Sequence, residues 1–378
     1  MKILFLVNTV EGINVWRRAL ALSTIIQKKH PGLLIRLINR KRSRSEDLLY
    51  FLKFLLANHW DMFHIFEPFP PTFPALYPLL KALRKPIIYD SGDIHFAVSR
   101  ISGQSYARYV ALKSFELTAF QFSNAIIIRG RGMSEILEYL FKVDPEKLLW
   151  IPDGVDFAHF SPKNADRAKE RLNLEGKIII GYASDYRPVK VENLQLCRGW
   201  ELIHVSKRLI DRGYRDFLVL MVGKGRALDA LKKMAVELGV KDYVRFTGFV
   251  PDELYPIYVS AMDICFYESL DDISYQAMIG TKMKEYMACG KPVVAGEIGE
   301  AKYVLRDAGI LVKPLKPKEA DIPRYLDDIT KAMVLLIKDE VLRKKLGSNA
   351  RKRAEEYYDW NKIAEKLSQF YLSLLQKE

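Results

Sequence analysis

The feature that most constrains this chain is an alternation, repeated twice, of short β-branched runs with longer amphipathic segments. The first series of apolar runs is "KILFLVN", "LLIRLINR", "MFHIFEP", "PIIYDSGD", "NAIIIRG" and "KLLWIPDGVD". The second is "KIIIGYAS", "FLVLMVG", "VRFTGFV", "MDICFYES", "KPVVAGE" and "GILVKP". Strand-length runs that alternate with helix-length segments are typical of βαβ units and a parallel sheet. We therefore predict an α/β protein with two doubly wound sheets.

The seam between the two series lies near residue 160. There, "GVDFAHFSPKNADRAKERLNLEGK" replaces the apolar periodicity with small residues, a proline and charges. A chain of 378 residues can bury two separate cores. We expect a first domain over 1–160, a second over 161–355, and a C-terminal helix over 356–378 that returns to the first domain. Ligands bind outside the carboxyl ends of such strands, so the cleft between the domains is the expected site.

Composition narrows the setting and the partners. The three cysteines, Cys197, Cys265 and Cys289, lie far apart, without the close pairs of a zinc site or a disulfide framework. No apolar run reaches the ~20 residues that span a bilayer, and "ILFLVN" is too short for a signal peptide. We expect a cytoplasmic protein that is not integral to a membrane.

The net charge of +13 favours an anionic partner. Its cations lack an aromatic-interleaved or recognition-helix pattern, so we do not expect nucleic acid.

The stretch "GTKMKEYMACGKPVV" is the strongest local signal for a ligand. A strand ends near Tyr267, and a helix is predicted to begin near Thr281 and to end at Gly290, where Pro292 blocks its continuation. A helix that starts at the carboxyl end of a parallel sheet directs its free amides into the cleft, as a phosphate site requires. Lys282 adds a positive charge in the first turn.

Glu285 lies one helical turn further along, roughly 5 Å from the first amides. A carboxylate there can accept two hydrogen bonds from a ribose diol, which suits a nucleoside diphosphate. From spacing alone, the alternative is that Glu285 is a solvated helix residue and Lys282 a chance neighbour. The loop at Gly12 also ends a strand and opens a helix, whose amides would point into the same cleft.

Several motifs resemble those of one enzyme family. "GTKMKEYMACGKPVVAGEIGEAKYVLRDAGILVKP" resembles the signature of the retaining, family 4-like glycosyltransferases (glycosyl transferases group 1), which have the GT-B fold of two facing Rossmann-like domains. "LLWIPDGVDFAHFSP" resembles the interdomain strand and Asn-Gly-Val-Asp turn, with Asp153 where Asn is usual. "LVLMVGKG", "VRFTGFVPDELYPIYVSAMDICFYES" and the terminal "YDWNKIAEKLSQFY" follow in the family's order, so the resemblance covers nearly the whole chain.

The resemblance implies roles for individual residues on the donor side. Glu285 would hold the ribose, and the backbone around Phe249 and Val250 would meet the base. The stretch from Met278 to Lys282, which includes Gly280 and Thr281, would face the phosphates and the sugar.

A basic pair in the loop "GYASDYRPVKVENLQLCRGWEL" is also implied. Arg198-Gly199 resembles the family's Lys-Gly, and its partner would be Arg187 or Lys190. Such a pair neutralises charge that develops on the leaving diphosphate, and so substitutes for a metal. We therefore expect no metal and no cofactor, with the nucleotide sugar as substrate. The alternative is three solvated cations.

Two positions depart from the family pattern. Ala277 stands eight residues before Glu285, where the family commonly has a Glu that contacts the donor sugar. Gly92 precedes Asp93 where the family often has a catalytic-site His before the Asp, and the nearest imidazole is His95. Either Asp93 and His95 serve catalysis, or His95 is a packing or helix-start residue and the site differs.

The function implied is transfer of a sugar from a nucleotide-diphosphate sugar to an acceptor hydroxyl, with retention and without metal, by a hexosyltransferase-like enzyme of carbohydrate or glycolipid biosynthesis. The leaving diphosphate would deprotonate a sugar or lipid-linked acceptor, while Arg198 and Lys282 stabilise it. One alternative is a catalytically weak nucleotide-sugar-binding protein. Another is a sugar-nucleotide 2-epimerase, with acid and base groups drawn from Asp93, His95, Glu297 and Glu300.

A contact with acidic membrane is a further expectation. "QKKHPGLLIRLINRKRSRSEDLLYFLKFLLANHW" sets several cations beside an apolar helix, and related enzymes that glycosylate lipids dock on acidic membranes with such a face. The alternative is that "LLYFLKFLL" packs on its own sheet, while Arg40 to Arg44 form a solvated loop.

Overall fold

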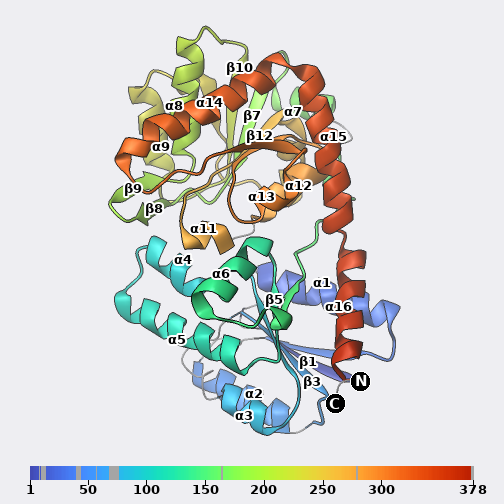
Figure 1. The fold of residues 1–378 in the computed structure, drawn as a ribbon. Helices are drawn as coiled ribbons and strands as arrows, with labels where there is room; N and C mark the ends of the chain where they lie inside the picture. The colour runs from blue at the N-terminus through green and yellow to red at the C-terminus, as the bar shows by residue number, and fades with distance from the viewer. Residues whose placement is uncertain are drawn as a thin grey trace.

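The computed structural model describes residues 1–7, 9, 14–39, 44–56, 58–67, 76–162, 165–277 and 280–375, with side chains omitted for 44–49, 76 and 375. The chain forms two lobes, each built around a six-stranded parallel sheet (Figure 1). All twelve strands predicted from the apolar runs are present, so the predicted fold class is confirmed.

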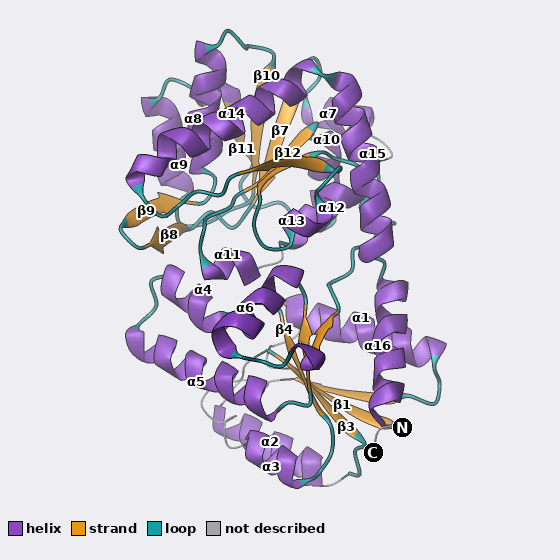
Figure 2. Ribbon diagram, viewed as in Figure 1, coloured by secondary structure: helices purple, strands orange, loops and turns teal. Residues whose placement is uncertain are grey.

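The first sheet has the order β2-β1-β3-β4-β5-β6. Strands β1, β3 and β4 are buried almost end to end, as expected when helices cover both faces of a parallel sheet (Figure 2). The strands are β1 (Lys2–Val7), β2 (Leu34–Asn39), β3 (Met62–Phe66), β4 (Ile87–Ser91), β5 (Ala125–Ile128) and β6 (Leu148–Trp150). The helices of this lobe are α1 (Asn14–Lys29), α2 (Arg44–Leu56), α3 (Leu76–Ala82), α4 (His95–Ile101), α5 (Tyr106–Phe122) and α6 (Arg131–Phe141).

The second sheet has the order β11-β10-β7-β12-β13-β14. Its strands are β7 (Ile178–Ala183), β10 (Phe217–Val222), β11 (Val244–Phe246), β12 (Ile264–Tyr267), β13 (Val293–Gly296) and β14 (Gly309–Val312). The helices that follow residue 164 are α7 (Ala165–Leu172), α8 (Trp200–Asp211), α9 (Leu228–Glu237), α10 (Tyr255–Ala261), α11 (Ile273–Ala277), α12 (Thr281–Ala288), α13 (Ala301–Val304), α14 (Ile322–Lys338), α15 (Glu340–Tyr357) and α16 (Trp360–Leu375).

The two strand orders place the ligand positions. In the second sheet the order reverses between β7 and β12, and in the first sheet it reverses between β1 and β3. Ligands of open parallel sheets bind outside the carboxyl ends of the strands at such a reversal. The loops after β7 and β12 and the loops after β1 and β3 are therefore where site residues are expected.

Each lobe contributes a buried side chain to the apolar core of the other lobe. Ile101, at the end of α4, packs in the apolar cluster that contains Tyr182 and Tyr186 of the second lobe. In return, Ala277 at the end of α11 packs in the first-lobe cluster with Met133 and Ile94. Figure 1 shows α11 lying between the two lobes, next to α4 and α6. The cleft is therefore closed on this side by apolar contacts.

Two crossings of the chain between the lobes lie side by side. Val155, in the first crossing, forms a β-bridge with Asp359 in the second, and its N–H donates to the Tyr358 carbonyl at 2.9 Å. A Cβ on Gly154 would lie 2.3 Å from the Trp360 ring, so this close approach requires glycine. After the second crossing, α16 lies on the first lobe, where its face at Ile363, Leu367 and Tyr371 is buried, as its periodicity predicts (Figure 1).

An antiparallel hairpin was not predicted from the sequence. Strands β8 (Pro188–Val191) and β9 (Leu194–Cys197) form it within the long loop after β7, with Glu192 at a φ of 51° in the turn. Its inner face, at Val189, Val191 and Leu194, packs in the second-lobe core. The hairpin carries the chain outward and returns it to Arg198 at the start of α8.

Candidate active site

Helix α12 begins at Thr281, as predicted, and ends at Ala288, two residues before the predicted end at Gly290. Gly290 has a φ of 67°, the left-handed conformation that glycine supplies after a helix. At the other end, a Cβ on Gly280 would lie 2.2 Å from the Tyr267 ring, so glycine allows that ring to pack under the helix start. Thr281 is exposed at this end.

Glu285 lies on α12 with its carboxylate half-buried. The Tyr255 hydroxyl donates a hydrogen bond to it, and burial raises the pKa of Glu285, against the opposing effects of this bond and of Lys284 and Lys282. A carboxylate of a half-buried residue that accepts one hydrogen bond retains the acceptor capacity that a diol requires.

Lys282 and Arg198 meet at a carboxylate that was not predicted. Glu268, directly after β12, is 4% exposed, with its carboxylate 3.8 Å from Lys282 Nζ and 3.5 Å from Arg198 Nε. The Tyr182 hydroxyl donates to the same carboxylate. Lys282 Nζ also lies 3.2 Å from Ser184 Oγ and 4.6 Å from the centre of the Tyr182 ring. The two cations are thus fixed at the strand-order reversal between β7 and β12.

The charge states of this cluster follow from burial and from its neighbours. Burial lowers the pKa of Lys282 to about 8, although Glu268 acts in the opposite direction. Burial alone would lower the pKa of Arg198, but Glu268 together with nearby tyrosines raises it above its usual range. Burial and the nearby Glu268 raise the pKa of Glu201, in the first turn of α8, to about 8, so this acid is mainly neutral at pH 7.

The two alternative partners of Arg198 lie in different surroundings. The Arg187 carbonyl accepts a hydrogen bond from the Arg198 N–H at 3.1 Å, and after burial it is the Arg198 charge that most lowers the pKa of Arg187. The Arg187 charge also reaches Lys282. Lys190 is exposed on β8, whose Val189 and Val191 face inward. The structure therefore gathers Arg187, Arg198 and Lys282, and places Lys190 on the outer face of the hairpin.

The predicted base contacts lie beyond β11. Phe249 is 63% exposed, with Lys224 Nζ 4.5 Å from the centre of its ring, and Val250 is partly buried. Gly223 donates its N–H to the Gly248 carbonyl at 3.1 Å, which joins the loops after β10 and β11. Gly12 and Met278, the remaining predicted contacts, lie outside the described residues.

The first lobe presents a second ionic cluster, centred on Asp90 at the end of β4. Arg18 Nε and Arg129 Nε each donate to this fully buried carboxylate at 2.9 Å, and His64 Nε2 lies 3.4 Å from it. Burial alone would raise the pKa of Asp90, but the two arginines hold it well below its usual range. Arg18 also donates to Asp153 at 2.8 Å. Asp90 therefore anchors this cluster.

His95 and Asp93 lie beside this cluster at the edge of the cleft. His95 Nε2 is ion-paired with Glu67, whose carboxylate also contacts Arg129 Nη2 at 2.8 Å. Burial raises the pKa of Asp93, although His95, Arg129 and Arg198 act in the opposite direction. Since Arg198 belongs to the second lobe, Asp93 lies close enough to that lobe for the charge of Arg198 to act on it.

The positions that depart from the family pattern have packing explanations. A Cβ on Gly92 would lie 2.5 Å from Arg129 Nη1, so the guanidinium fills the space that a side chain at 92 would need. Ala277 is buried against the first lobe, where a carboxylate would lie among apolar side chains. Glu268 is the acidic side chain that lies beside Arg198 and Lys282 instead.

Two of the acids considered for an epimerase differ in environment. Glu300 accepts hydrogen bonds from the Arg131 N–H at 2.6 Å and from Arg131 Nη2 at 3.0 Å, which ties α6 to the second lobe. Tyr358 adds a third donor at 3.4 Å. Glu297 is exposed. Glu300 thus serves as an interlobe contact.

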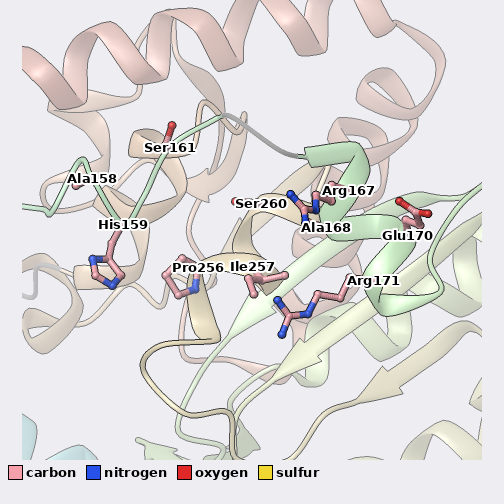
Figure 3. Close-up of a pocket in the computed structure, with 10 residues that line it drawn as sticks. All are labelled: Ala158, His159, Ser161, Arg167, Ala168, Glu170, Arg171, Pro256, Ile257 and Ser260. Atoms are coloured by element: carbon pink, nitrogen blue, oxygen red, sulfur yellow. The ribbon is translucent and has the colours of Figure 1, made fainter.

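A cavity of about 860 Å³ lies elsewhere, between residues 158–161, α7 and α10 (Figure 3). Its lining includes His159, Arg167, Arg171 and Ser260, and none of the predicted site residues. The described residues contain no group of three or more His, Cys, Asp or Glu side chains arranged to hold a metal ion.

The described part of the chain also contains no helix that is long and apolar enough to cross a bilayer. In α2, Phe51 and Leu55 are buried in the first-lobe core. The apolar residues of the stretch considered for membrane docking therefore pack at least partly on their own sheet. Residues 40–43, which hold most of its basic loop, lie outside the described part of the chain.

Residues 164–353 match the family model "Glycosyl transferases group 1", and this match covers half of the chain. The chain belongs to this family. Among curated relatives, the MMP alpha-(1->4)-mannosyltransferase of Mycolicibacterium hassiacum is 28% identical over 291 residues, which are 76% of this chain and 63% of that protein. The D-inositol 3-phosphate glycosyltransferase of Thermomonospora curvata is 27% identical over 247 residues, which are 61% and 53% of the two chains. The matched part thus spans less than two thirds of these relatives.

Solved structures share the fold of this glycosyltransferase family member. Anabaena HepE in complex with UDP-glucose superimposes with a TM-score of 0.70 at 17% identity, over 99% of this chain and 100% of that one. WaaG, a glycosyltransferase involved in lipopolysaccharide biosynthesis, gives a TM-score of 0.67 at 15% identity, over 97% and 99% of the two chains. At these identities the likeness concerns the fold, and it confirms the predicted GT-B architecture.

Proposed function

We propose that the protein transfers a sugar from a nucleotide-diphosphate sugar to an acceptor hydroxyl, with retention and without a metal. The observation that carries this proposal is the convergence of Arg187, Arg198 and Lys282 at the start of α12, with Glu285 one turn further along. Cations and free helix amides suit a diphosphate, and the carboxylate suits the ribose beside it. The family's curated relatives carry the names of sugar transferases.

In this mechanism the diphosphate leaves while bound by the three cations. Their charges stabilise the negative charge that develops on the leaving oxygen, which is the main way in which such a site lowers the barrier. The leaving phosphate then takes the proton of the acceptor hydroxyl on the same face of the sugar. Asp93 and His95 lie on the opposite side of the cleft, where they would contact the sugar or the acceptor.

A sugar-nucleotide 2-epimerase is less well supported. It would need acid and base groups that are free to exchange protons with the sugar. Glu300 is held by three donors, and Glu297 is exposed. Turnover with any acceptor would also exclude a protein that only binds nucleotide sugars.

The proposal also covers the cellular compartment and the acceptor. We place the reaction in the cytoplasm, because the three cysteines are free and two of them, Cys265 and Cys289, are buried thiols that a reducing compartment keeps intact. The acceptor would be a sugar or a lipid-linked sugar. Contact with acidic membrane would then involve the basic segment before α2.

The experiment is a thermal-shift screen with UDP, GDP, ADP and their sugar conjugates, with and without magnesium. A ligand at about 100 times its dissociation constant adds about 2.7 kcal/mol of stability. We expect one nucleoside diphosphate to raise the midpoint without magnesium. No shift with any nucleotide, with or without the metal, would overturn the proposal.

A further inference from the structure

Glu67 has a backbone conformation that few side chains adopt. It follows β3 at the strand-order reversal of the first sheet, and its φ is 66°. Non-glycine residues in this region are strained, and such residues concentrate at functional sites when the surroundings hold them. Here the Glu67 N–H donates to the Asp90 carbonyl at 2.9 Å, and the residue is 6% exposed. The residue held in this conformation carries a buried carboxylate.

That carboxylate is divided between two partners. One oxygen, Oε1, contacts Arg129 Nη2 at 2.8 Å and accepts the Gly92 N–H at 3.3 Å. The other oxygen, Oε2, is ion-paired with His95 Nε2. Because a Cβ on Gly92 would collide with the Arg129 guanidinium, glycine at 92 is needed for this arrangement. Arg129 fixes Glu67, and Glu67 in turn fixes the imidazole.

His95 is more exposed than the carboxylate that holds it. Its side chain is 25% exposed, whereas that of Glu67 is 8% exposed. The Glu116 carboxylate accepts the N–H groups of His95 and Phe96, each at 3.0 Å, and so anchors the start of α4. The charge of Asp93 also acts on the ring. The acids around His95 are thus Glu67 from β3, Glu116 from α5 and Asp93 from its own loop.

We infer that Glu67 is a positioning residue, whose ion pair with His95 fixes the orientation and the positive charge of that ring where the first lobe meets the donor. This inference rests on the proposed function and deepens it. An imidazolium carries a proton on both nitrogens, so it can only donate hydrogen bonds. His95 would therefore donate to an oxygen of the sugar or of the diphosphate, and it would not act as a base toward the acceptor.

The expected pH dependence has a definite sign. Burial alone would lower the pKa of His95, but Glu67, with Glu116 and Asp93, raises it to about 9. The ring thus stays charged across the neutral range. In Glu67→Gln the pKa should fall toward or below its usual value of about 6.5. The charged fraction at pH 8 would then be about 25 times smaller than at pH 6, while in the unmodified protein it changes little.

The test is a titration of the histidine ring signals by NMR in the unmodified 378-residue chain, with the His95 signal assigned from His95→Gln. We expect a midpoint near 9, and a midpoint at or below 6.5 would overturn the inference. This measurement needs neither a donor nor a folded Glu67→Gln variant. The matched control is Asp156→Asn, which removes the carboxylate 3.2 Å from the exposed His159 and should leave the His95 midpoint unchanged.

A second readout follows the reaction. The rate of hydrolysis of the sugar conjugate of the best-binding nucleotide is measured from pH 6 to pH 8 in both proteins. We expect a nearly flat profile for the unmodified protein and a fall of about 25-fold for Glu67→Gln. Parallel profiles would overturn the role of Glu67. Failure of every nucleotide to bind would instead overturn the proposed function, and the NMR midpoint would still test the ion pair.

Discussion

The two edges of the cleft carry similar side chains but differ in how their charges are balanced. On the first-lobe edge, Arg18 and Arg129 are both paired with the buried Asp90 and extend to Asp153 and Glu67. On the second-lobe edge, Lys282 and Arg198 lie beside one buried carboxylate, Glu268, and the charge of Arg187 acts on both cations.

The difference shows what each edge can bind. A cluster whose cations are already paired is rigid and gains little from a further anion, whereas an edge with excess positive charge attracts one. The neutral state of Glu201 at pH 7 preserves this excess. We therefore propose that the diphosphate binds on the second lobe and that the first lobe contacts hydroxyl groups.

The largest effect is expected on the first-lobe edge, where the charges are balanced. Arg129→Met would leave Asp90 and Glu67 buried without one of their cationic partners, so it should lower the free energy of unfolding by about 3–5 kcal/mol. Urea denaturation measures this. Lys344→Ala removes an exposed pair with Glu340 and should change nothing measurable. A loss in the Arg129 variant no larger than in this control would contradict the account.

On the second-lobe edge, where positive charge is in excess, removing a cation should lower the rate of turnover. Arg198→Ala removes a charge that stabilises the leaving diphosphate, so we expect sugar transfer or donor hydrolysis to slow by about 10²–10³-fold. Lys190→Ala, in the same loop but exposed on β8, is the matched control and should retain the rate. Equal losses in both variants would show that the loop contributes only general positive charge.

A third prediction concerns the contact that holds the two lobes together. A Cβ on Gly132 would lie 2.4 Å from the Gln276 carbonyl and 2.6 Å from Gly299 Cα, both in the second lobe. Gly132→Ala should disfavour the closed arrangement by about 1–3 kcal/mol, with a larger radius of gyration in X-ray scattering and slower turnover. Gly32→Ala, which meets open space, is the control. An unchanged radius together with unchanged turnover would show that closure does not depend on this contact.

The smallest expected effect is the pH dependence of donor binding. In the protein without ligand, burial lowers the pKa of Lys282 to about 8. A bound diphosphate would favour the charged form of this side chain. Binding therefore takes up a proton above pH 8, and affinity should fall by up to about tenfold per pH unit there. Calorimetric titration from pH 7 to pH 9.5 measures this. Lys282→Arg stays charged and should flatten the profile, apart from the share due to Glu201. If donor affinity falls as steeply with pH in Lys282→Arg as in the unmodified protein, the pH dependence does not come from Lys282.

The sequence predicted the fold well because buried parallel strands leave strong local signals. Runs such as "FLVLMV" are apolar on both faces, and Gly290 with Pro292 marks the end of α12. The β8–β9 hairpin and α11 were missed, because their short segments are stabilised by contacts with distant residues rather than by their own periodicity.

In the site, the predicted residues Lys282, Glu285 and Arg198 lie near one another, but the carboxylates that organise both edges were missed. Glu67 and Glu268 each follow directly after a strand at the point where the strand order reverses. That position was a usable signal, since the chain order of the strands was predicted. Arg129 could not have been found, because its role depends on the space above Gly92.

The most direct test of the central claim is the affinity of the best-binding nucleoside diphosphate for the unmodified protein and for Glu285→Ala, measured by calorimetry without metal. Loss of hydrogen bonds to a charged group costs about 1.5–3 kcal/mol, which is about 10-fold to 150-fold in the dissociation constant. The account predicts a loss in this range with an unchanged melting temperature of the free protein. Equal affinities in the two proteins would contradict the placement of the donor on the second-lobe edge.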